Sequence, residues 1–173
     1  MDATQGIAQV STLATQYSLS AWSSASDFLI IIVLVSLLFF YGWYVGRGPF
    51  VAILLAIYAG YAVYVAFPYA SLLPTAPALT ALLAQAGVYL GVSFVFFIVL
   101  RRVVVSDFLY VGVFGLIALS FFATGFLLAL AYHVFPVAPV YHFTPAMDLL
   151  FASKQYFFWW FIAPAVGLFF LAR

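Results

Sequence analysis

Five apolar stretches divide this sequence, and none of them contains an Asp, Glu, Lys or Arg residue. They cover residues 28–45, 50–67, 78–100, 108–135 and 155–172. A helix needs about 20 consecutive apolar residues to cross the hydrocarbon core of a bilayer. Because backbone polar groups in lipid must be paired within the chain, stretches of this kind are typical of helices. The sequence therefore predicts an all-α integral membrane protein, a bundle of four to five transmembrane helices.

The composition excludes the other broad classes of protein. Only 5% of the 173 residues are charged, whereas soluble domains carry about 25%, so a solvated surface cannot be built. A hydrophobic fraction of 69% excludes a disordered chain. The absence of cysteine excludes disulfides and thiolate metal sites, and a net charge of +1 argues against nucleic acid as a partner. The predicted partner is the lipid bilayer, and no cofactor is predicted.

Turn and cap residues divide the chain further. Residues 1–26 are polar and predict an external N-terminal segment with a short interfacial helix or a frayed tail, and residues 27–173 form a single transmembrane domain. Asp27 and Asp107 are predicted to cap the first and fourth spans. Pro49, after the turn at residues 46–48, is predicted to start the second helix, which makes an antiparallel hairpin with the first. Thr144 is predicted to cap a short helix that reaches about residue 153.

The last apolar stretch, 155–172, contains Pro164 and is barely long enough to span, so a re-entrant segment is the competing interpretation. If it spans, Arg47, Arg101, Arg102 and Arg173 all fall on one side of the membrane. Basic residues favour the cytoplasmic side. We therefore predict an external N-terminus and a cytoplasmic C-terminus.

Small residues four positions apart predict where helices approach closely. The bundle itself can use these faces, or one of them can bind a second copy or another membrane protein. The pairs and ladders are Gly42 and Gly46; Ala52, Ala56 and Gly60; Gly87 and Gly91; and Gly125 and Ala129.

A second group consists of polar side chains within the predicted spans. Their hydroxyls and amide need partners away from water, so hydrogen bonds between helices are the first interpretation. A path for an uncharged or weakly polar solute is the alternative. The group comprises Tyr58, Tyr61, Tyr64, Gln85 and Tyr89.

The inventory of reactive residues does not predict an enzyme. The four acids all lie at predicted membrane boundaries, and the usual hydrolase, metalloprotease and phosphate-binding motifs do not occur. His133, His142 and Asp148 could in principle bind a metal, but their spacing fits no short ligand motif. We expect interfacial histidines rather than a metal site.

Three features resemble the colicin V production protein family of small bacterial inner-membrane proteins. An Asp opens the first apolar helix, a Gly-Arg-Gly turn follows it at 46–48, and a basic loop at 101–102 leads to Asp107 and a fourth helix with Gly112 and Gly115. The resemblance covers residues 27–135. It implies a bacterial inner-membrane location and a role in peptide export or envelope maintenance, without catalytic residues. The candidate cytoplasmic interaction residues are Arg47, Gly48, Arg101, Arg102 and Asp107.

Two functions are open at this point. The first is a non-enzymatic polytopic membrane protein that acts as a scaffold, assembly factor or envelope-maintenance component. The second is a small transporter or channel subunit for an uncharged or weakly polar solute, which requires a polar cavity between the helices.

Overall fold

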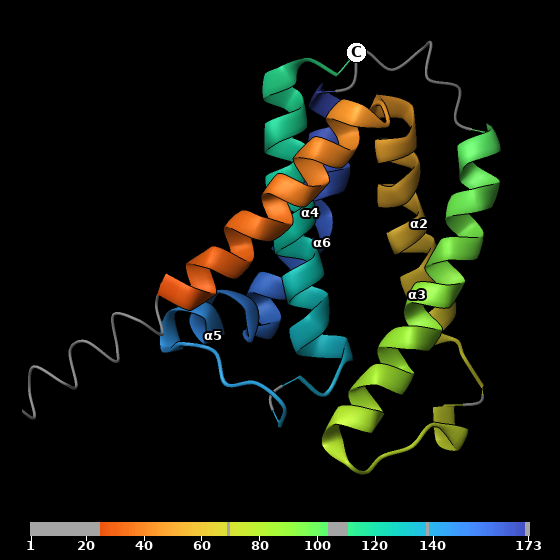
Figure 1. The fold of residues 1–173 in the computed structure, drawn as a ribbon, viewed down its shortest axis with the longest axis vertical. Coiled ribbons are helices and arrows are strands. Elements are labelled where there is room, and N and C mark those ends of the chain that lie inside the picture. The colour runs from red at the N-terminus through yellow and green to blue at the C-terminus, as the bar shows by residue number, and fades with distance from the viewer. Residues whose placement is uncertain (1–24, 69, 104–110, 138, 172–173) are drawn as a thin grey trace, which may run out of the picture.

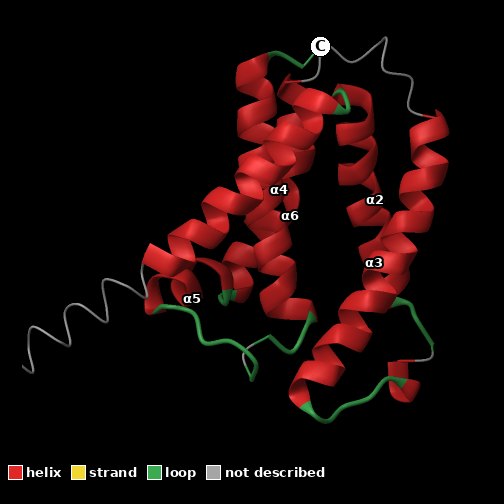
Figure 2. Cartoon of the chain, in the orientation of Figure 1, coloured by secondary structure: helices red, strands yellow, loops and turns green. Residues whose placement is uncertain are grey.

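The computed structural model describes residues 25–68, 70–103, 111–137 and 139–171. The elements in these residues are helices, as predicted (Figure 2). A short 3₁₀ helix, η1 (Ala70–Leu72), lies in the loop before α3. The α-helices are Ala25–Tyr44, α2 (Arg47–Val65), α3 (Ala78–Val103), α4 (Val113–Val134), α5 (Pro145–Phe151) and α6 (Lys154–Leu171).

Four of these helices are long and apolar enough to cross a membrane: Ala25–Tyr44, α2, α3 and α4. The chain is therefore a multi-pass membrane protein. The fifth predicted span is α6, which is one helix of 18 residues with Pro164 inside it. Figure 1 shows α6 running alongside α4, and whether it crosses the membrane stays a prediction. The predicted N-terminal interfacial segment lies almost wholly outside the described residues.

α4 is the central helix, because each of its faces packs against a different neighbour. Leu116, Leu119 and Ala123 lie in a buried cluster with Phe50 and Leu54 of α2. Other α4 side chains, Phe126 and Leu130, join Ile57 and Tyr89 from the α2–α3 side, while Leu128 and Ala129 pack against α5. Phe126 is completely buried. Residues of α4 thus take part in each of these three buried clusters.

The long helices pack in two pairs, and the first helix crosses the bundle obliquely. α2 packs against α3, and α4 packs against α6 (Figure 1). The chain reverses direction between the helix Ala25–Tyr44 and α2, as predicted. The helix Ala25–Tyr44 itself runs obliquely across the bundle, and its first turns lie beside α5. Ile31 and Leu34 pack there against a cluster of α4 and α5 residues. The predicted hairpin is therefore splayed, because the N-terminal half of this helix packs on α4 and α5 rather than on α2.

Two predicted helix starts are wrong. α2 begins at Arg47 rather than at Pro49, with Gly46 at its N-cap and a backbone φ of 112° that favours glycine. Pro49 is thus the third helical residue, which is tolerated because amides in the first turn need no intrahelical acceptor. α4 begins at Val113 after Gly112, five residues after the predicted start, and the predicted cap Asp107 lies outside the described residues. Val111 precedes it with only 1% of its surface exposed, packed in a buried cluster rather than in a helix.

The short helix after the last proline-rich loop is confirmed. Thr144 is the N-cap of α5 and Pro145 occupies its first turn. Asp27, by contrast, does not lie at a helix boundary as predicted, since the helix already includes Ala25. Its carboxylate is used elsewhere, as described below.

Candidate functional site

The predicted basic cluster lies at one end of the bundle. Arg47 is the first residue of α2, and Arg101 and Arg102 are in the last turn of α3. Figure 1 shows that these two helix ends lie at the same end of the molecule. Both α3 arginines are exposed, whereas Gly48 is buried. Asp107, the fifth residue of the group, lies outside the described residues.

Two of the predicted intramembrane tyrosines join helices through hydrogen bonds to the main chain. The Tyr89 hydroxyl on α3 donates to the carbonyl oxygen of Ile57 on α2, at 3.0 Å. The Tyr58 hydroxyl on α2 donates to the carbonyl oxygen of Phe161 on α6. The Tyr58 ring also stacks on Phe126, with centroids 4.6 Å apart. Each of these two bonds joins different helices, α3 to α2 and α2 to α6.

The other members of the group lie in partly buried positions. Tyr61 packs edge-on against Phe157 and Phe161, and Tyr64 against Tyr89. Gln85 is half-buried on α3. The cavity beside Tyr89 is lined almost entirely by apolar side chains. It does not supply the polar path that the transport alternative needs, so no specific observation favours that alternative.

Three of the predicted small-residue faces serve packing inside the bundle. A Cβ atom placed on Gly60 would lie 2.0 Å from the Ser93 hydroxyl oxygen of α3. One placed on Gly125 would lie 2.2 Å from the Trp160 ring of α6, and one on Gly42 would lie 2.6 Å from Leu116. A side chain at any of these glycines would force its neighbour to move, so each glycine serves the close approach of two helices.

The fourth face, on α3, is open. A Cβ atom on Gly87 or Gly91 would meet nothing within 4 Å. The two glycines are four residues apart, so they lie one above the other on the same side of the helix. Large apolar residues on this helix, such as Leu83 and Phe94, are more than 60% exposed. α3 therefore carries a small-residue face that the described part of the chain does not use.

The histidines do not come together as a metal site. His133 Nδ1 lies 3.0 Å from the carbonyl oxygen of Ala129 on its own helix, and its ring packs on Phe157. His142 and Asp148 line a separate small pocket with Tyr132 and Tyr141. Among the described residues, no group of three His, Cys, Asp or Glu side chains could hold a metal ion.

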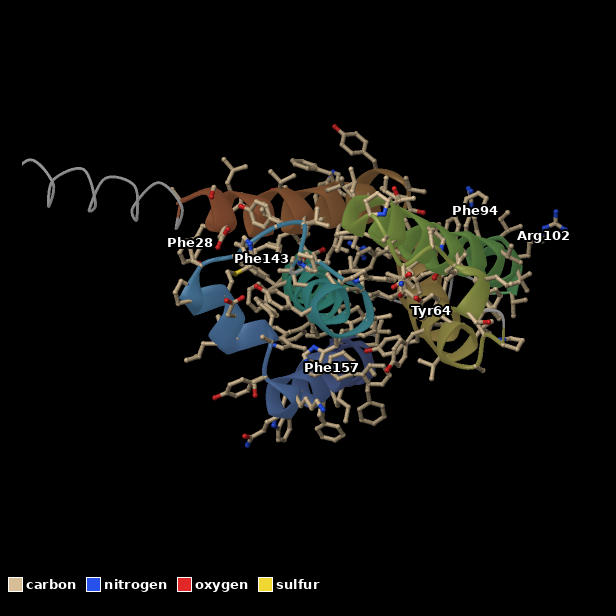
Figure 3. The ribbon with its side chains drawn as sticks, turned by 90° about the horizontal axis from the view of Figure 1, so that it is seen from below. Phe28, Tyr64, Phe94, Arg102, Phe143 and Phe157 are labelled. Atoms are coloured by element: carbon tan, nitrogen blue, oxygen red, sulfur yellow. The ribbon has the colours of Figure 1, made fainter. Side chains whose placement is uncertain are left out.

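Sequence reasoning missed the true partner of Asp27. This residue is only 3% exposed, and its carboxylate accepts hydrogen bonds from the Thr144 amide at 2.7 Å and from the Thr144 hydroxyl at 2.6 Å. The Tyr141 hydroxyl donates to it at 3.3 Å. The labelled neighbours Phe28 and Phe143 lie on the same side of the molecule (Figure 3). The carboxylate therefore ties the first helix to the N-terminus of α5, more than 110 residues away in the chain.

A second bond stabilises the same region. The Tyr132 hydroxyl at the end of α4 donates to the Asp148 carboxylate of α5, at 2.8 Å. Both Asp27 and Asp148 lie within electrostatic range of the Tyr132 hydroxyl. An acid directly before a long apolar stretch was the one sequence signal that could have indicated a distant partner.

The end of the bundle with α5 is thus held by carboxylates, and the opposite end carries arginines. No family model, curated protein or solved structure matches the chain. The argument for how this chain meets other molecules therefore rests on its own geometry.

Proposed function

We propose that this protein is a non-enzymatic membrane scaffold or assembly factor that holds another transmembrane helix, from a partner protein or a second copy, on the open face of α3. The observation that carries the proposal is the difference between the glycine faces. Gly42, Gly60 and Gly125 are filled by neighbouring side chains, whereas Gly87 and Gly91 have open space above them. In lipid, close backbone approach is a main source of attraction between helices.

The packing of α3 supports this role. Of the described helices, it packs extensively only against α2, and only 11% of its most apolar stretch is buried. Tyr89 and Ser93 make its link to α2, through the Ile57 carbonyl and the close approach to Gly60. The opposite side is left for lipid or for another helix.

A pair of double substitutions tests the proposal. Gly87→Leu with Gly91→Leu fills the open face, and Gly87→Ala with Gly91→Ala keeps it small. A photo-crosslinking amino acid at Leu83 in intact membranes reports any helix on this face. We expect a defined cross-linked product in the native chain and in the alanine variant, and its loss in the leucine variant. An equal product in all three chains, or none in the native chain, contradicts the proposal.

We extend the proposal to the membrane in which the protein lies, its biological role and its orientation. The resemblance to the colicin V production protein family supports a bacterial inner-membrane location and a role in export or envelope maintenance. The common position of Arg47, Arg101 and Arg102 at one end of the bundle supports a cytoplasmic location for that end.

Because the chain has no cysteine, single cysteines at Ser71, Ser153 and Val103 test this orientation with a membrane-impermeant thiol reagent. We expect external labelling at Ser71 and Ser153 and protection at Val103. The reverse pattern contradicts the orientation without affecting the scaffold proposal.

A further inference from the structure

An apolar cavity of about 340 Å³ lies between the helix Ala25–Tyr44, α2 and α3, with Leu127 of α4 also in its wall. Its walls include Leu38 from the first helix and Ala56 from α2. From α3 come Leu90, Phe94 and Phe97, which follow one side of that helix. Since Leu90 and Phe94 are both about 60% exposed, the cavity opens sideways toward the space that lipid occupies.

A second, more polar pocket continues the first along α3. It is lined by Phe94, Phe97 and Ile98 together with Arg101 and Arg102. Phe94 and Phe97 belong to both pockets, so the two form one groove. Figure 3 shows Phe94 and Arg102 on the outer side of α3. Tyr41, from the opposite wall, lies within electrostatic range of Arg101. The groove is therefore apolar over most of its length and cationic at one end.

The length of this groove matches one leaflet. From Leu90 to Arg101 the α3 axis rises about 16 Å, which is about half of the ~30 Å hydrocarbon core. With the arginines at headgroup depth, the apolar end of the groove reaches the middle of the membrane. An acyl chain attached to a headgroup runs over this same distance.

We propose that this groove is a specific binding site for an anionic phospholipid, with one acyl chain in the apolar cavity and the phosphate on Arg101 and Arg102. Guanidinium groups bind phosphate oxygens through two parallel hydrogen bonds and keep their charge at all physiological pH values. The size of the cavity decides against a second helix as its occupant. A helix segment 16 Å long occupies about 1,500 Å³, which exceeds the two pockets of the groove together, about 340 Å³ and about 430 Å³.

Native mass spectrometry of the full chain in mild detergent tests the proposal, with phosphatidylglycerol and phosphatidylcholine as the probes. We expect one phosphatidylglycerol to stay bound under conditions that remove phosphatidylcholine. Each basic residue near a headgroup contributes about a fivefold preference for anionic lipid. The double variant Arg101→Gln with Arg102→Gln should therefore lower retention by more than about tenfold. Lys154→Gln removes one charge at the opposite end of the bundle and should leave retention unchanged.

The apolar half of the groove is tested separately. Leu90→Trp places a large ring in the cavity and should abolish retention of phosphatidylglycerol. Leu83→Trp is the matched control, because Leu83 is 63% exposed on the same helix but does not line the cavity. Circular dichroism shows whether each variant folds, and the arginine variant decides the question if the tryptophan variant does not.

Three outcomes overturn the proposal. Equal retention of the two lipids indicates only a non-specific lipid shell. Unchanged retention in the arginine variant removes the headgroup site. A cross-link from a photoreactive residue at Leu90 to another protein, in place of lipid, assigns the groove to a partner. Because these variants leave Gly87 and Gly91 intact, failure here is distinguishable from failure of the scaffold proposal.

Discussion

In α4, 61% of the most apolar stretch is buried inside the protein, whereas in α3 the figure is 11%. Both helices are long, uncharged in their central turns and rich in large apolar side chains. What separates them is where their small residues point. Gly125 of α4 admits the Trp160 ring, while Gly87 and Gly91 of α3 face open space. In a membrane, therefore, apolarity shows that a helix is in the bilayer, and the small residues show which helices meet.

The largest expected effect is the difference in stability loss between a large-to-small substitution in α4 and one in α3. Phe126→Ala should lower the free energy of unfolding by about 3–5 kcal/mol, because Phe126 is fully buried and leaves a cavity. Phe94→Ala on α3 should change it by less than about 0.5 kcal/mol, since lipid or detergent fills the vacated space. Thermal unfolding in detergent, followed by circular dichroism, measures both. Equal losses would break the comparison.

The next largest effect concerns the hydrogen bonds between Asp27 and Thr144, which hold the first helix to the start of α5. Asp27→Ala removes the acceptor of both Thr144 hydrogen bonds. Hydrogen bonds to a buried charge are worth about 1.5–3 kcal/mol, and we expect a loss in that range by the same unfolding measurement. Asp148→Ala serves as the control, because this exposed carboxylate has one described partner, Tyr132. A loss at Asp148 as large as that at Asp27 contradicts the assignment.

Replacing one glycine by alanine in each helix adds a single methyl group and tests the comparison of α4 with α3 most directly. Gly125→Ala should destabilise by about 1–3 kcal/mol, because the new Cβ would lie 2.2 Å from the Trp160 ring. Gly87→Ala should be neutral or stabilising by up to about 1 kcal/mol, because alanine is the better helix former and nothing lies nearby. Both are read as shifts in the unfolding midpoint. Destabilisation by Gly87→Ala in detergent would show that this face is already occupied within the chain.

The smallest effect tests how firmly α3 is held. Tyr89→Phe removes the hydrogen bond to the Ile57 carbonyl and keeps the ring. Hydrogen bonds between transmembrane helices average about 0.6 kcal/mol, so we expect a loss of about that size. Tyr44→Phe, at an 82% exposed position, is the control and should change nothing. The control matters here because the expected difference is close to the precision of the measurement.

Sequence reasoning located the helices well and their first residues less well. Residues 78–100 were predicted as a span and form α3, which begins at Ala78. The predicted cap at Asp107 misplaced the start of α4 by five residues, because the burial of Val111 in the core is a tertiary contact that no local pattern records. The same limit applies to Asp27, whose partner Thr144 is distant in sequence.

The candidate residues divide in a similar way. The basic residues Arg101 and Arg102 could be placed from sequence, since charge is excluded from the hydrocarbon core. The tyrosines could be predicted to need partners, but not to find them in the carbonyl groups of Ile57 and Phe161. The groove along α3 was not predicted at all, because residues from four separate helices form its walls.

The sequence by itself determined that this chain lies in a membrane, that it is helical, and that its charges lie at the ends of the helices. Each of these follows from the free energy of moving single residues or peptide groups into hydrocarbon, which depends on composition along the chain. Only the tertiary structure decided which glycines are filled, that α4 is central and that α3 is open. Since lipid and neighbouring helices are equally apolar, hydropathy cannot separate these arrangements, and shape complementarity between side chains selects one of them.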